Sequence, residues 1–237
     1  MRLCKLSTFA LAALLALSGG AADSAAGVGR AAGEAGRQAP AVYRLDASRS
    51  ELMIRAFAGG PLWFKGHDHL IRARDFEGEA SLTPGSAGAA SLTLTVRAAS
   101  LAETRDEFTP EQKKIIDGEL LGAVLEPDKY PEITFRSTDA SVEPRGGDLY
   151  ALRLGGDLTL RGVTRHVTVP VEVTLRGDEM RARGEFTVKR SDFKVPATSA
   201  FHGTVRVRDR LKVSFEIVAR RVRESVRNPS GDFRGGL

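Results

Sequence analysis

The chain has 237 residues, yet it contains one cysteine, Cys4, one tryptophan and only 6% aromatic residues. A single cysteine cannot form an internal disulfide, so a scaffold held together by disulfides is excluded. The sequence also contains no G-x-S-x-G elbow, no P-loop, no G-x-G-x-x-G and no H-E-x-x-H motif. These absences argue against the enzyme classes that the motifs mark, and we expect a protein that is not an enzyme. A small hydrolase or isomerase without a recognisable motif is the enzymatic alternative that remains.

Long apolar runs are missing as well. The most pronounced run, Leu6 to Leu17, is too short for a membrane-spanning helix, which needs roughly 20 apolar residues. It follows two basic residues and precedes a zone of small residues, an order typical of a secretory signal peptide. We therefore predict a cleaved signal peptide over residues 1–22, an Ala/Gly-rich flexible leader over residues 23–41, and a periplasmic or secreted protein. An uncleaved N-terminal membrane anchor is the alternative.

The formal net charge of +5 does not belong to the part of the chain that folds. The predicted signal peptide contributes +2, the leader 0 and residues 220–237 contribute +3, which leaves 26 basic and 26 acidic residues in 42–219. A neutral core gives no support to nucleic-acid binding. Residues 220–237 are predicted to be a basic disordered tail that makes weak contact with an anionic membrane or cell wall.

Apolar and polar residues alternate with a period of two through most of residues 42–219, as in Val167 to Leu175 and Leu211 to Ile217. This alternation is typical of antiparallel strands with one buried face. Pro170 within one run indicates an edge, a bulge or the wider side of the ladder. Several long strands in succession predict a single all-β domain, either a barrel or a sandwich. The strands are expected at about 42–46, 51–58, 69–83, 89–101, 132–143, 149–161, 165–176, 179–189 and 204–219.

One segment departs from this period. Thr109, Pro110 and Gln112 fit a capping box with proline in the first turn. Ile116, Leu120 and Val124 then follow at intervals of four. We predict one short amphipathic α-helix over residues 110–121, packed on or across the barrel as a wall or lid.

Four short motifs occur in order along the chain. They are Tyr43-Arg44-Leu45-Asp46, Tyr130-Pro131-Glu132-Ile133-Thr134-Phe135, the stretch from Gly156 to Thr164, and Arg190-Ser191-Asp192-Phe193. With these motifs the sequence resembles the YceI-like family of periplasmic polyisoprenoid-binding proteins over residues 42–219. Lys194 stands where the family usually has a glycine, so we expect the turn there to take another shape.

The resemblance implies a lipocalin-like extended antiparallel β-barrel of about eight strands that sequesters or carries a long isoprenoid or other apolar lipid. No cofactor other than such a lipid is expected, and homodimer formation is left open. Period two does not distinguish a hollow barrel from one that its own side chains fill. The residues predicted to line a lipid tunnel are Phe57, Leu94, Val96, Ile116, Leu120, Phe135, Leu152, Leu160, Val171 and Phe186.

The sharpest polar feature is His67-Asp68-His69. In an extended segment, residues two apart project to the same face, so both imidazoles are placed to chelate one metal ion. Zinc or copper needs one or two further ligands. The candidates for these are His166, His202, Asp75 and Glu77. A metal-binding stress or sensor protein is therefore the alternative function. The simpler interpretation is that His69 hydrogen-bonds in the barrel mouth while His67 and Asp68 face solvent.

Overall fold

The computed structural model describes residues 40–83, 90–200 and 204–223. The predicted signal peptide, the leader up to residue 39 and residues 224–237 of the predicted tail lie outside them. The strands are β1 (Ala41–Leu45), β2 (Glu51–Gly59), β3 (His69–Ala73), β4 (Phe76–Leu82), β5 (Ala90–Arg97), β6 (Leu101–Glu103), β7 (Glu132–Gly146), β8 (Leu149–Leu160), β9 (Val163–Arg176), β10 (Glu179–Lys189), β11 (Ser199–Ala200) and β12 (Val205–Arg221).

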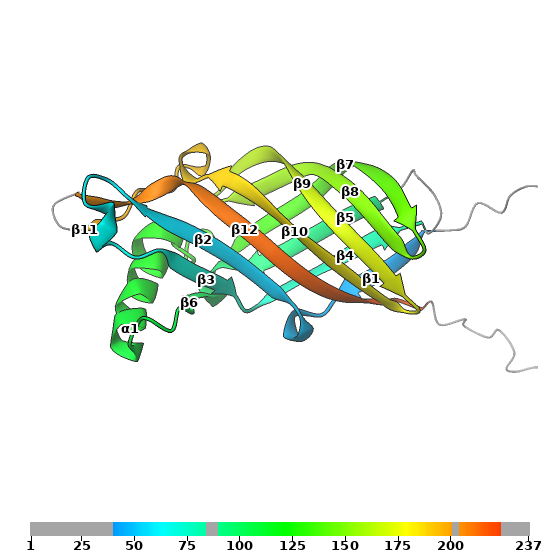
Figure 1. Cartoon of the computed structure of the whole chain (residues 1–237), viewed down its shortest axis with the longest axis horizontal. Coiled ribbons are helices and arrows are strands. Elements are labelled where there is room, and N and C mark those ends of the chain that lie inside the picture. Colours follow the sequence, from blue (N-terminus) through cyan, green and yellow to red (C-terminus); the bar gives the residue numbers. More distant parts are fainter. Residues whose placement is uncertain (1–39, 84–89, 201–203, 224–237) are drawn as a thin grey trace, which may run out of the picture. The chain divides into compact units, whose positions relative to one another are not determined.

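Eight antiparallel strands close into a barrel (Figure 1). They follow the order β1-β4-β5-β7-β8-β9-β10-β12, and β12 returns to β1 through pairs such as Tyr43 with Arg221. The predicted all-β antiparallel barrel with one short α-helix is therefore confirmed. β12 runs to Arg221, so Arg220 and Arg221, which the sequence assigned to the tail, lie in a strand.

Two of the predicted strands are divided. The 3₁₀ turn η3 (Ala98–Ser100) interrupts the predicted strand 89–101 between β5 and β6, whereas η1 (Ala47–Arg49) connects β1 and β2, which are predicted as separate strands. The predicted strand 69–83 likewise divides into β3 and β4. The strands β2, β3 and β6 form a branch of the sheet in the order β12-β2-β3-β6. This branch stops at β6. Strand pairing therefore leaves the wall open between β6 and β7 at that end, although the eight strands of the barrel itself form a closed ring.

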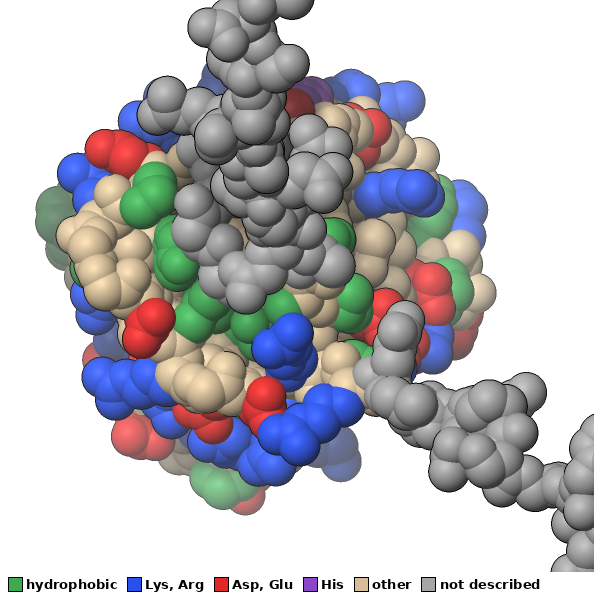
Figure 2. Space-filling model, turned by 90° about the vertical axis from the view of Figure 1, so that its right-hand side faces the viewer, with side chains coloured by type: hydrophobic (Ala, Val, Ile, Leu, Met, Phe, Trp, Pro, Cys, Tyr) green, Lys and Arg blue, Asp and Glu red, His purple; other side chains and the backbone are tan. Residues whose placement is uncertain are grey.

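We call this end of the barrel the helix end, because the helix α1 (Pro110–Glu119) lies there, with the 3₁₀ turn η5 (Arg190–Phe193) beyond the end of β10 (Figure 1). The opposite end, where β1 begins and β12 ends, is called the terminal end. On the visible part of the face at the terminal end, hydrophobic side chains lie further in and charged side chains lie mostly around the rim (Figure 2).

A second opening at the helix end lies between β9 and β10. These strands pair only from Glu179 with Arg176 to Arg183 with Glu172. Pro170 lies two residues beyond Glu172 of the last pair, on a stretch of β9 that does not pair with β10, so its missing N–H leaves no ladder hydrogen bond unmade on that side. A Cβ on Gly184 would lie 2.3 Å from the Pro170 carbonyl oxygen, so glycine is required for this close approach. Pro170 thus occupies an edge, as predicted.

The helix begins as its sequence predicts. Thr109 Oγ1 accepts from the Gln112 N–H at 3.3 Å, and Gln112 Oε1 accepts from the Thr109 N–H at 2.9 Å. The α-helix ends at Glu119, two residues before the predicted end, and continues as a π-helical turn, η4 (Leu120–Leu125). Among the described residues, no helix is long and apolar enough to cross a membrane.

Candidate ligand-binding cavity

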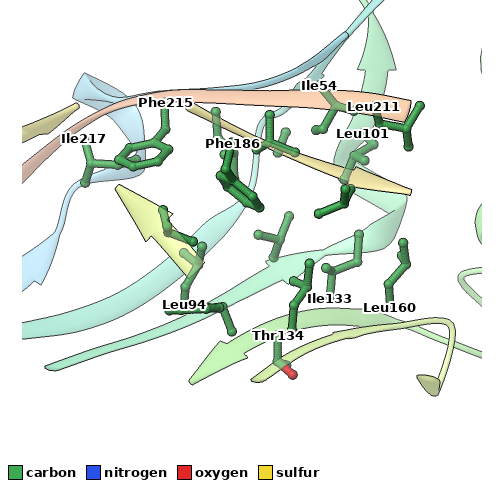
Figure 3. A pocket seen from close by; sticks show the side chains of 18 of the residues that line it. Ile54, Leu94, Leu101, Ile133, Thr134, Leu160, Phe186, Leu211, Phe215 and Ile217 are labelled. Carbon is green, nitrogen blue, oxygen red and sulfur yellow. The ribbon is translucent and has the colours of Figure 1, made fainter. Parts of the chain in front are cut away.

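A cavity of about 330 Å³ runs along the interior of the barrel. Such a volume falls within the range of small-molecule sites, roughly 300–1,000 Å³. Side chains from facing strands, among them Leu94, Phe186 and Phe215, point toward one another across this space (Figure 3). Its lining is overwhelmingly apolar because alternate residues of each strand project inward.

Nine of the ten residues predicted to line a tunnel border this cavity. They are Leu94, Val96, Ile116, Leu120, Phe135, Leu152, Leu160, Val171 and Phe186. Ile116 and Leu120 reach it from the cover formed by α1 and η4, whereas the neighbouring Ile115 is 68% exposed. The cover therefore forms part of the cavity wall. Whether these residues bind a ligand stays a prediction.

Phe57 is the exception, and its assignment to the cavity is wrong. Leu52, Ile54 and Ala56 of β2 line the cavity, so Phe57 has the opposite parity in the strand and faces outward. The Arg55 guanidinium lies 5.3 Å from the centre of the Phe57 ring on that outer face. The prediction failed because Phe57 was chosen for its size and not for its position in the alternation.

The charged side chains that line the cavity all lie at the helix end. They are His69, whose charge depends on its protonation, Glu119 and Arg190. At the terminal end the polar lining consists of Ser81 and Ser91, whose hydroxyls hydrogen-bond to each other at 2.7 Å. A ligand with one polar end would therefore find its polar partners at the helix end.

Arg190 is the cation of this set. Its Nη1 donates to the Val195 carbonyl oxygen at 3.0 Å. Its Nε is buried and, among the described residues, has no hydrogen-bond partner, since Asp209 Oδ1 is 3.9 Å away. Asp209 instead accepts from the N–H and the hydroxyl of Ser191 at 3.0 and 2.9 Å, and the hydroxyl bond is the main reason that the pKa of Asp209 is lowered.

Lys194 closes this turn in the left-handed region, with φ 55° and ψ 27°. This is the conformation that glycine favours. The lysine therefore holds a backbone geometry that is costly for a residue with a Cβ, and the expected difference in turn shape from the family stays a prediction.

Glu103 is a buried carboxylate beside the cavity wall. Its Oε1 accepts from the N–H groups of Leu70, Thr104 and Arg105 at 2.9–3.1 Å, and its Oε2 lies 2.8 Å from His69 Nδ1. These contacts satisfy the carboxylate in a place where an unpaired one would be costly. They also fix the orientation of the His69 ring.

The helical cover is attached to the barrel at its middle and at its end. In the last turns of α1, Asp117 Oδ1 accepts from the Glu103 N–H at 2.7 Å. At its end, Arg161 donates to the carbonyls of Ala123 and Val124 at 3.1 and 2.6 Å and to Glu126 Oε2 at 2.5 Å. A cation on the last carbonyls of a helix is a favourable cap. The motif that contains Arg161 thus holds the cover in place.

The two histidines of the predicted metal site pack on one phenylalanine. The His69 ring stacks on Phe108 at 5.6 Å between centroids, and the His67 ring meets Phe108 edge-on at 5.5 Å. Asp68 accepts from the Ala58 N–H and from Arg55. Within the described ranges, no three His, Cys, Asp or Glu side chains lie close enough to hold a metal ion.

The reserve ligands do not converge on this pair. Asp75 lies by Ser100, and His166 lies 3.6 Å from Asp157 on the strand pair β8–β9. Glu77 belongs to β4 and pairs with Thr95. His202 is outside the described residues. Asp75, His166 and Glu77 therefore do not supply a third ligand to His67 and His69. Metal binding at these two histidines stays a prediction.

Sequence reasoning missed Glu103, Arg161 and Arg190 as parts of the site. A charged residue in a strand or turn is expected to face solvent, and no local pattern shows which one turns inward. Ile54 and Leu211 were missed as lining residues although their alternation could have found them, since both follow the period of their strands.

Residues 43–219 match the YceI-like domain family. Among curated relatives, Protein YceI of Escherichia coli O17:K52:H18 is 29% identical over 168 residues, covering 68% of this chain and 80% of that protein. A UPF0312 protein of Pseudomonas aeruginosa strain LESB58 is 27% identical over 180 residues, covering 73% and 85%.

Solved structures share the fold. BcnA of Burkholderia cenocepacia superposes with a TM-score of 0.56 at 23% identity, covering 73% of this chain and 98% of that one. A structure described as a polyisoprenoid binding domain from Saccharophagus degradans, implicated in plant cell wall breakdown, gives 0.53 at 14% identity, covering 76% and 98%. The family match spans most of the chain, and the protein therefore belongs to the YceI-like domain family.

Proposed function

We propose that the barrel binds a long-chain isoprenoid or related apolar lipid and sequesters or carries it, without catalysis, in the periplasm or outside the cell. The observation that carries this proposal is the apolar cavity along the barrel axis. Burial of a prenyl chain there would contribute about 0.8 kcal/mol for each methylene removed from water. The polyisoprenoid binding domain with the same fold is consistent with this ligand class.

The cavity also suits a ligand with a single polar end. The Arg190 Nε, which makes an ion pair of 3.9 Å with Asp209 but no hydrogen bond among the described residues, and the oriented His69 ring lie at the helix end. A hydroxyl, carbonyl or phosphate oxygen at that end would accept a hydrogen bond from the Arg190 Nε–H. The apolar chain would then extend toward the terminal end, among the inward-facing residues of β4, β5, β9 and β10.

The test is to identify what the protein carries. The chain is purified under native conditions and extracted with organic solvent, and the extract is analysed by mass spectrometry. We expect lipid in stoichiometric amount. Ala182→Phe places a ring in the cavity, and we expect it to reduce the bound lipid, whereas Arg183→Phe on the outward face of β10 is the matched control. No lipid in the wild-type extract, or equal loss in both variants, would contradict the proposal.

Arg190→Met tests the polar end separately. Methionine has an unbranched apolar side chain of similar length and lacks the N–H donors of the guanidinium. We expect the variant to retain less of a ligand with a polar head and to retain a pure hydrocarbon equally well. Unchanged retention of polar-headed lipid would remove Arg190 from the binding site and leave the cavity proposal intact. Circular dichroism confirms that each variant is folded.

A further inference from the structure

Two large aromatic side chains are held in solvent at the helix end. Trp63 is 55% exposed and Phe64 is 63% exposed, in the 3₁₀ turn η2 (Trp63–Lys65) that follows β2. Their rings touch edge-on with centroids 6.4 Å apart. Scattered single apolar residues are ordinary on a protein surface, whereas two adjacent aromatic rings require an explanation.

The backbone fixes this exposure. The Leu62 N–H donates to the Thr204 carbonyl at 3.1 Å, and the Gly66 N–H donates to the Trp63 carbonyl at 3.0 Å. Gly60 adopts φ +89°, and a Cβ there would lie 2.5 Å from the Thr204 carbonyl oxygen. The turn is therefore built against the barrel, and its aromatic residues project outward from a fixed support.

The surroundings of the turn are basic. Segment 60–66 contains Lys65 and no acidic residue, and the adjoining start of β12, Val205 to Arg210, contains three arginines and one aspartate. Four basic residues thus stand against one acidic residue. Gly59 pairs with Arg206, and a Cβ on Gly59 would lie 2.8 Å from the Arg208 side chain, which places Arg206 and Arg208 beside the turn.

Two carboxylates next to this segment are already paired. Asp68, three residues after Lys65, binds Arg55 at 3.2 Å. Glu107, which lies 3.7 Å from His67, forms an ion pair with Arg105. They therefore subtract little from the positive charge that the turn and the first residues of β12 present.

We propose that the turn Pro61–Lys65 is a membrane-docking tip, which inserts Trp63 and Phe64 into the interface of an anionic bilayer. Aromatic residues flanked by basic ones are suited to this position, since the rings enter the headgroup boundary while the cations meet anionic lipid. The tip lies at the end of the barrel where the polar groups of the cavity lie. It would therefore bring that end of the cavity to the bilayer from which an apolar ligand comes, a consequence that rests on the proposed function.

Trp63 is the chain's only tryptophan, so its fluorescence reports on the tip alone. The full chain, in the same processed form for every variant as verified by intact mass, is titrated with vesicles of phosphatidylcholine and phosphatidylglycerol. We expect the emission of Trp63 to shift to shorter wavelength and to be quenched by lipids brominated on their acyl chains. Pure phosphatidylcholine vesicles should bind more weakly, because they offer no anionic partner to the basic residues.

Variants separate the tip from the rest of the chain. We expect Phe64→Ser to weaken vesicle binding by about tenfold, since one aromatic ring no longer enters the interface. Lys65→Glu should weaken binding to anionic vesicles only. Val222→Ser is the control, since this exposed apolar residue lies at the terminal end, and it should bind as the wild type does.

Three outcomes would overturn the docking proposal. The first is an emission spectrum of Trp63 that vesicles leave unchanged. The second is an equal loss of binding in Phe64→Ser and Val222→Ser. The third is a spectral shift that occurs without vesicles and rises with protein concentration and molecular mass, which would show that the tip binds a second copy of the chain.

The lipid that co-purifies is measured in the same samples. Its absence together with intact vesicle binding would contradict the proposed function and not the docking site.

Discussion

At the terminal end of the barrel, β1 pairs with β4 on one side and with β12 on the other, and β9 pairs with β10. The interior there is apolar, with Tyr43, Leu82 and Ala219 each 1–2% exposed. At the helix end the wall opens twice, and α1, η4 and η5 cover the openings. Backbone pairing and apolar packing thus close one end, whereas buried polar side chains hold the cover of the other. The two ends of the barrel are therefore held closed by different kinds of contact.

The largest effect is expected from the packing of the terminal end. Leu82→Ala should lower the free energy of unfolding by about 2–5 kcal/mol, because it removes a buried apolar side chain and enlarges the cavity that Leu82 borders. Urea unfolding followed by circular dichroism measures the change. Ile115→Ala on the exposed face of α1 is the control and should change stability by less than about 0.5 kcal/mol. Equal losses in the two variants would contradict the idea that this end carries the stability of the barrel.

The same comparison explains how far the sequence predicts this protein. Alternation along β9 and β12 predicts the strands and the inward-facing residues, because a period of two is a local property of the chain. The capping box at Thr109 predicts the start of the helix for the same reason. The terminal end, which strand pairing and apolar side chains build, is therefore largely readable from the sequence.

The helix end is not readable in this way. Glu103 is buried because three N–H groups and an imidazole from separate segments converge on it, and no local pattern encodes that convergence. Arg161 reaches the end of the helical cover from a turn more than thirty residues further along the chain. Charged residues are ordinarily expected at the surface, so the residues that hold the cover are the ones that sequence reasoning overlooks.

Glu103→Gln should weaken the helix end while leaving the terminal end unchanged. The amide keeps the shape but replaces a carboxylate that accepts several hydrogen bonds, which we expect to cost about 1–3 kcal/mol. Hydrogen exchange should become faster at Leu70, Thr104 and Arg105 and in α1, and not at Tyr43. Glu107→Gln is the matched control because that side chain is 51% exposed. Uniformly faster exchange along the whole barrel would contradict a separate helix end.

Arg161→Lys should have a smaller effect on the same cover. Lysine retains the charge but not the planar fork that reaches two carbonyls and a carboxylate at once. We expect a loss of about 1 kcal/mol or less in stability. Exchange at Leu125 and Glu126 should quicken, and lipid loading should become faster if this cover admits the ligand. Unchanged loading with faster exchange would place the entry elsewhere.

Tyr43→Phe at the terminal end is expected to have the smallest effect on stability at neutral pH. Burial is the main cause that raises the pKa of Tyr43 above its ordinary value of 10.0. In the unfolded chain the phenol ionises at lower pH than in the barrel, so stability is present below pH 10 and is lost as the pH rises through the folded-state pKa. Tyr43→Phe removes the ionisable phenol. The free energy of unfolding of this variant should therefore fall less steeply than that of the wild type between about pH 9 and about pH 11. Urea midpoints at each pH measure the two slopes. Parallel curves would show that ionisation of Tyr43 does not limit the alkaline stability of this end, and the loss of stability would then have to come from groups elsewhere in the barrel.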